Sequence, residues 1–177
     1  MSDTTFAAFH PVSDTCIREA MGLWFEQFAP GQVFDHRPGI TVSQTANANE
    51  ALASLNQAMI HFDHHYAEAT EFGVPLVVST LTLQYAIGLG WKTFGRRRRI
   101  LGFSSIRLIA PVRGGDTLYA RSRIIATAPL ADDPDCGAVE AVIALLRPDG
   151  ATIADIGCTF AIYRHGTASG LPASFGA

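Results

Sequence analysis

The sequence predicts an α+β fold in which an antiparallel sheet wraps one long central helix. Residues 74–91 are an apolar run without a single charged side chain, as expected for a helix that is buried on most faces. From Ile100 onward, segments rich in β-branched and aromatic residues alternate with turn sequences, which is typical of an antiparallel meander. Helices first and strands afterwards favour this class over an alternating parallel fold.

The N-terminal third predicts an arm followed by short elements. We expect residues 1–19 to be a weakly structured arm, and residues 20–165 to be the single folded domain. Residues 23–28 are amphipathic and end at a Pro-Gly turn, and residues 32–36 and 40–43 have the composition of short strands.

Three helical segments are expected next. Thr45 or Asn47 can cap a helix that runs to about residue 55, and residues 66–70 can add one more helical turn. The long central helix is expected over residues 75–93, because Pro75 is tolerated in the first turn of a helix.

Four strands are expected after the central helix, separated by turn sequences such as Pro148-Asp149-Gly150. The last residues, 166–177, are expected to be a flexible tail. The four expected strands are residues 100–112, 117–128, 137–147 and 151–164.

The composition argues against several classes of protein. The net charge of −3 and the pI near 6 argue against a general nucleic-acid binder. The three cysteines are far apart and without a CxxC motif, so a disulfide framework and a zinc site are disfavoured and a reducing, cytoplasmic location is expected. The apolar run contains Ser, Thr and Gln and is shorter than a membrane span, and the N-terminus resembles no signal peptide. We therefore expect no membrane partner.

A cluster of titratable residues precedes the central helix. His61, Asp63, His64 and His65 fall within five positions, directly before Phe72 and the apolar run. Histidine titrates near neutral pH and suits reversible proton transfer, so His61 is a candidate base. A metal site is disfavoured, because adjacent ligands on one short loop rarely complete a coordination shell.

Two stretches together resemble the MaoC-like dehydratases, a branch of the hot-dog fold. They read HFDHHYAEATEFGVPLV (residues 61–77) and FSSIRLIAPVRGGDTL (residues 103–118). Within this family, the residues of the first stretch are most similar to those of the mesaconyl-CoA hydratase, or methylmalyl-CoA dehydratase, branch. The resemblance covers residues 25–164 and implies a single hot-dog fold. It also implies addition or removal of water across the α,β bond of an acyl-CoA thioester, with coenzyme A as part of the substrate and no other cofactor.

The resemblance also implies the site. The family pairs an Asp with a His five residues later; His61 matches the His, whereas Asn56 stands at the Asp position. An amide has no basic site in the useful range, so His61 would be the base while Asn56 orients a water molecule. Backbone N–H groups of Val78, Ser79 and Thr80 would bind the thioester oxygen, as orphan donors at a helix start can.

Several further residues are candidates for substrate binding, each with a structural alternative. Asp63 can instead cap a helix, Tyr66 and Phe72 can belong to the core, and Arg107 can form an ion pair across a subunit contact. Arg96 and Arg97 begin a run of four arginines. This run can bind the phosphates of coenzyme A, or it can be a solvated charged loop, and the sequence favours neither.

Two other functions compete with the hydro-lyase. A hot-dog thioesterase usually needs a carboxylate near the central helix, and residues 74–94 contain no Asp or Glu. An acyl-CoA-binding relative with weak or no catalysis is the second alternative, and Asn56 favours it.

A single hot dog leaves a sheet edge open, so at least a homodimer is expected, with the two sheets continuous across the contact and the active site near it.

Overall fold

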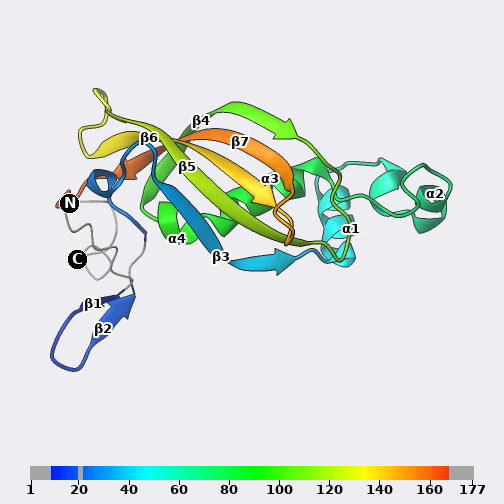
Figure 1. Cartoon of the computed structure of the whole chain (residues 1–177), viewed down its shortest axis with the longest axis horizontal. Helices are drawn as coiled ribbons and strands as arrows, with labels where there is room; N and C mark the ends of the chain where they lie inside the picture. The colour runs from blue at the N-terminus through cyan, green and yellow to red at the C-terminus, as the bar shows by residue number, and fades with distance from the viewer. Residues whose placement is uncertain (1–8, 20–21, 168–177) are drawn as a thin grey trace.

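The computed structural model describes residues 9–19 and 22–167, and it has the predicted α+β architecture. A five-stranded antiparallel sheet has the order β3-β5-β6-β7-β4, and a separate hairpin is formed by β1 and β2 (Figure 1). The strands are β1 (Phe9–Pro11), β2 (Ile17–Glu19), β3 (Val33–Thr41), β4 (Arg97–Leu108), β5 (Thr117–Pro129), β6 (Cys136–Leu146) and β7 (Thr152–Tyr163). The helices are α1 (Gln44–Ala53), α2 (His64–Glu68), α3 (Ser79–Leu89) and α4 (Trp91–Phe94), with 3-10 turns η1 (Phe25–Gln27) and η2 (Met59–His61).

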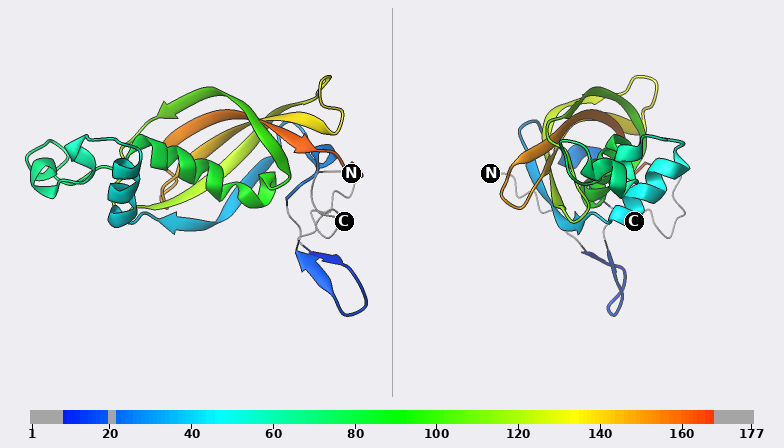
Figure 2. Two further views of the ribbon diagram at one scale, coloured as in Figure 1. Left: turned by 180° about the vertical axis from the view of Figure 1, so that it is seen from behind. Right: turned by 90° about the vertical axis from the view of Figure 1, so that its right-hand side faces the viewer.

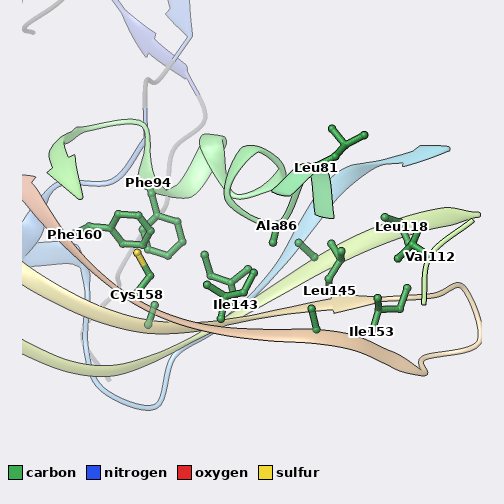
Figure 3. Packing of buried hydrophobic residues seen from close by; sticks show 14 of the residues in the cluster. Leu81, Ala86, Phe94, Val112, Leu118, Ile143, Leu145, Ile153, Cys158 and Phe160 are labelled. Atoms are coloured by element: carbon green, nitrogen blue, oxygen red, sulfur yellow. The ribbon is translucent and has the colours of Figure 1, made fainter. Parts of the chain in front are cut away.

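The sheet curves around α3, and the core lies between them (Figure 2). Along β6 and β7 the chain buries side chains such as Ile143, Leu145 and Ile156 completely. Ala86 of α3 faces this layer, and Phe94 of α4 stacks on Phe160 with ring centroids 4.7 Å apart (Figure 3). None of the helices within the described residues has the length and apolar run that a membrane span requires.

The central helix begins later than predicted. The residues after Pro75 are extended because their N–H groups bond elsewhere: Leu76 donates to the Ile60 carbonyl and Val77 to the Val112 carbonyl. The helix therefore starts only at Ser79, and Gly90 divides it from the single turn of α4. The extended segment brings the loop after α1 against the start of α3.

Other boundaries also differ from the prediction. The amphipathic segment of residues 23–28 contains only the turn η1, and the two short strands are one strand, β3, with an irregularity between His36 and Ile40. Ser43, and neither Thr45 nor Asn47, caps α1. Residues 9–19 of the expected arm form the β1–β2 hairpin; residues 1–8 and most of the expected tail lie outside the described residues.

Strand β4 is an edge strand whose side chains are exposed along nearly its whole length. Phe103 is 43% exposed and Ile106 is 49% exposed, although both are large and apolar. An exposed apolar edge strand is an unpaired template for another chain.

His36 is buried where β3 meets α4. Its Nε2 lies 2.9 Å from the Ser122 hydroxyl and its Nδ1 3.3 Å from the Thr93 hydroxyl. Burial lowers the pKa of His36 to about 4, because the charged imidazolium would lose its hydration there. The ring is therefore neutral at pH 7.

Candidate active site

His61 lies at the end of η2 and faces a cleft of about 310 Å³ beside the first turn of α3. Helices α1 and α2 are at this same end of the sheet (Figure 1). The cleft wall is mostly apolar; its residues are His61, Phe72, Leu76, Val77, Ser79, Thr82, Leu108, Ile109, Ala110, Pro111 and Val112.

One hydrogen bond sets the protonation of the His61 ring. Nδ1 of His61 lies 2.9 Å from the carbonyl oxygen of Leu76. A carbonyl oxygen can only accept, so Nδ1 carries the hydrogen of the neutral ring and Nε2 keeps its lone pair. The ring nitrogen left free is therefore the one that can act as a base.

Asn47 joins the His61 turn to the start of α3, a role that the sequence analysis missed. Its side chain is fully buried and its Nδ2 donates to the carbonyls of His61 and Leu76, both at 2.9 Å. Its Oδ1 accepts from the N–H of Val78 at 2.8 Å. The signal was an Asn in the middle of an Ala-rich helix, where Asn has low intrinsic preference and needs a tertiary reason.

Gln44 is a second residue that the sequence analysis missed. Its Nε2 donates to the His61 carbonyl at 2.9 Å, so this carbonyl accepts from two side chains of α1. Gly114 packs against Gln44, since a Cβ at Gly114 would come within 2.7 Å of the Gln44 Cβ. This close approach favours glycine at position 114, whereas Gly115 has a φ of +92°, a backbone conformation that favours glycine.

The predicted set of N–H donors is corrected at one residue. Val78 is unavailable to a substrate because its N–H already bonds to Asn47. The N–H groups of Ser79 and Thr80 donate to no acceptor within the described part of the chain, and Ser79 lines the cleft. Both are in the first turn of α3, where the helix dipole also favours negative charge.

The other predicted residues of the His61 loop are only partly brought together. Phe72 lines the cleft, whereas Tyr66 is 42% exposed on α2 and lies outside the cleft wall. Asp63 caps α2 by accepting from the Tyr66 N–H at 3.0 Å, which is the structural alternative. Asn56 uses its Oδ1 to accept from the Ala58 N–H at 3.1 Å, and it also lies outside the cleft wall. Its role in orienting water stays a prediction.

The predicted arginines lie away from the cleft. Arg96 is 3% exposed, its guanidinium stacks 3.6 Å from the Trp24 ring centroid, and it donates to the Gly22 carbonyl. The expectation that Arg96 meets a phosphate is wrong, because its guanidinium is buried. Arg97 is half-buried over Trp91 and begins β4, so three of the four arginines of the run lie in a strand, and Arg96 lies in the turn before it.

Arg107 is exposed near the other end of β4, opposite Asp155 in the register with β7. Its predicted contact with substrate stays a prediction. Within the described residues, no group of three or more His, Cys, Asp or Glu side chains is placed to hold a metal ion.

The arrangement combines a base, unpaired donors and an apolar wall. Nε2 of His61 can exchange a proton with a bound molecule, and the N–H groups of Ser79 and Thr80 can stabilise an oxygen that becomes negative. The apolar side chains of the wall lower the local polarity, which strengthens both interactions. Such a site suits proton transfer next to a carbonyl group.

Comparison with known proteins shows the family to which the chain belongs. The model of the MaoC like domain matches residues 25–136, well over half of the chain. A β-methylmalyl-CoA dehydratase of Chloroflexus aurantiacus is 27% identical over 117 residues, which are 66% of this chain and 33% of that protein. The chain therefore spans about a third of the length of this curated relative.

Solved structures agree on the fold. A MaoC-domain dehydratase from Chloroflexus aurantiacus superposes with a TM-score of 0.77 at 23% identity, covering 81% of this chain and 45% of that one. A Mycobacterium tuberculosis protein described as a double hot-dog fold superposes with a TM-score of 0.72 at 23% identity, covering 88% and 50%. The chain has the hot-dog fold and belongs to the MaoC-like domain family.

Proposed function

We propose that this protein is a hydro-lyase that adds water to, or removes it from, the α,β bond of an acyl-CoA thioester. The observation that carries the proposal is that His61 and Ser79 line one cleft: Nδ1 of His61 is bound to the Leu76 carbonyl, and neither its Nε2 nor the Ser79 N–H has a hydrogen-bond partner among the described residues. The family match and the name of the Chloroflexus aurantiacus dehydratase support the same reaction class.

The mechanism follows from these positions. In hydration, Nε2 of His61 takes a proton from water as the water oxygen bonds to the β-carbon. The electron pair of the double bond moves toward the thioester, whose oxygen becomes negative and is stabilised by the N–H groups of Ser79 and Thr80. The imidazolium then returns a proton to the α-carbon, so that one water is added and the base is regenerated. The reaction needs no cofactor beyond the coenzyme A carried by the substrate.

We further propose that the chain works as a homodimer joined through β4. The exposed apolar side chains of this edge strand would be covered, and two sheets would become one. Leu108, the last residue of β4, lines the cleft, so the contact lies beside the site. This support is independent of the chemistry.

Binding without turnover is the competing function. A hydrogen bond within the Asn56 turn favours it. The side-chain oxygen of Asn56, the residue at the family's Asp position, already accepts from the Ala58 N–H and is therefore less available to orient a water molecule. The direct test is to follow the loss of the enoyl thioester absorbance with crotonyl-CoA. Hydration supports the proposal, whereas saturable binding of crotonyl-CoA without hydration, or release of free thiol, supports the binding protein or the thioesterase.

The apolar wall also bears on the acyl chain. A free carboxylate at the far end of that chain would lose its hydration against Val77, Leu108 and Ile109. We expect short uncharged enoyl chains to be used better than dicarboxylic ones. A substrate panel that includes crotonyl-CoA and mesaconyl-CoA measures this preference.

A further inference from the structure

A second cleft, of about 350 Å³, lies on the outer face of the sheet between β3, β5 and the turn after β6. Along β5 the side chains of Leu118, Ala120 and Ser122 are buried toward α3, so the alternate residues Tyr119 and Arg121 point outward. The cleft gathers three arginines that are far apart in the sequence, Arg37, Arg121 and Arg147, with Asp35 as its one carboxylate.

Each guanidinium of this cleft is fixed on one side. Arg37 stacks 4.7 Å from the Tyr119 ring centroid and donates to the His36 carbonyl at 2.8 Å. Arg121 donates from Nε to Asp35 at 2.6 Å. Arg147 donates from Nη2 to the Pro111 carbonyl at 2.7 Å and pairs with Asp116. The three cations are therefore oriented in advance.

The remaining N–H groups have no acceptor within the described residues. These are Nη1 and Nη2 of Arg121, Nε and Nη2 of Arg37, and Nε and Nη1 of Arg147. Hydrogen bonding to Arg121 lowers the pKa of the Asp35 carboxyl, so it stays ionised. With Asp116 on Arg147 also counted, the three positive charges outnumber the two carboxylates that pair with them. Guanidinium groups present a fork of donors that matches phosphate oxygens.

This cleft adjoins the candidate active site through one residue. The Pro111 carbonyl accepts from Arg147, and Pro111 also lines the cleft of His61. The arginine run at the start of β4, by contrast, is separated from Leu108 by the length of a 12-residue strand, roughly 35 Å. Of these two groups of arginines, only Arg37, Arg121 and Arg147 adjoin the acyl site.

We infer that Arg37, Arg121 and Arg147 form a phosphate-binding site that takes the diphosphate and 3′-phosphate of the substrate's coenzyme A. The inference rests on the proposed function, because it assigns the nucleotide end of the same substrate. The three guanidinium groups would recognise the phosphate groups of coenzyme A, and a free phosphate compound would bind to the same donors. The experiment must separate these two sources.

The test compares substrates with and without phosphates. In Arg121→Gln and Arg37→Gln, the ratio of kcat/KM for crotonyl-CoA to that for crotonyl-N-acetylcysteamine, which has no phosphate, should fall about tenfold. Arg123→Gln is the matched control: this residue is exposed on the same strand, two positions along, and lies outside the cleft wall. It should keep the wild-type ratio.

Calorimetry with adenosine 3′,5′-bisphosphate and with inorganic phosphate gives a readout that needs no turnover. Binding of the bisphosphate should weaken at least tenfold in Arg121→Gln and should decrease with added salt. If phosphates bind through Arg121 but the substrate ratio is unchanged, the ligand is a free phosphate compound and the assignment to coenzyme A is overturned. If neither quantity changes, the site is overturned altogether. If no thioester is turned over, the proposed function fails, while the calorimetry still decides the phosphate site.

Discussion

The Nδ1 atom of His61 lies 2.9 Å from the carbonyl oxygen of Leu76, and both residues are also held by the side-chain amide of Asn47. This links the candidate base to the extended segment that leads into α3. The same amide accepts from Val78, one residue before the donors at Ser79 and Thr80. The base and the donors are thus fixed relative to one another by a single buried residue.

The role of the N–H donors can be tested by removing one of them. Ser79→Pro deletes the N–H at the first helical position, where proline is tolerated, and Val78 already has extended backbone angles that suit a following proline. We expect kcat to fall by about 10²–10³-fold, because one donor to the thioester oxygen is lost. Ser79→Ala is the control, since it removes only the hydroxyl. Equal effects of the two substitutions on steady-state kinetics would contradict the donor role.

Asn47 should contribute strongly to stability. Asn47→Ala leaves the buried N–H of Val78 without a partner and removes one of the two side-chain donors from each of the His61 and Leu76 carbonyls. We therefore expect the free energy of unfolding to fall by about 2 kcal/mol. Asn49→Ala, at an exposed position of the same helix, should change it little. Urea unfolding followed by circular dichroism measures both variants; similar midpoints for them would show that Asn47 is dispensable.

The fold was predictable because its signals are local. The four strands of the meander are within a few residues of their predicted bounds, since alternation and turn residues mark each one. The start of α3 was not predictable, because distant partners, Asn47 and the carbonyls of Ile60 and Val112, keep residues 76–78 extended. Sequence reasoning selected His61 and Ser79, which line the same cleft, and their catalytic roles stay predictions. The burial of Arg96 under Trp24 depends on tertiary packing that no sequence spacing reveals.

Buried His36 should make the protein sensitive to acid. Its pKa is about 4 in the folded state against about 6.5 when unfolded, so between these values the unfolded chain binds the extra proton. The free energy of unfolding should therefore fall as the pH decreases from 6.5 to 4, by up to about 3 kcal/mol from this residue. His36→Gln cannot titrate and should lose this part of the pH dependence. Urea titrations at pH 7 and pH 4.5 compare the two proteins, and parallel losses in both would exclude His36 as the cause.

The proposed dimer depends on the exposed strand β4. Phe103→Glu places a charge in the middle of this edge, where an apolar contact is expected, and should convert the dimer to monomers at micromolar concentration. Ile125→Glu, on the exposed part of β5, is the control and should remain dimeric. Sedimentation velocity reports the outcome. A wild-type protein that sediments as a monomer would argue against the dimer.

The most direct test of the account is the turnover of His61→Ala on crotonyl-CoA, measured beside Asp63→Ala and His64→Ala. His61→Ala should lower kcat by about 10²–10⁴-fold with little change in affinity, because it removes the proton carrier and leaves the donors of α3 in place. The variants of the helix cap Asp63 and of the exposed His64 should retain most of the activity. Full activity in His61→Ala, together with its loss in either of the other two variants, would contradict the assignment of His61 as the base.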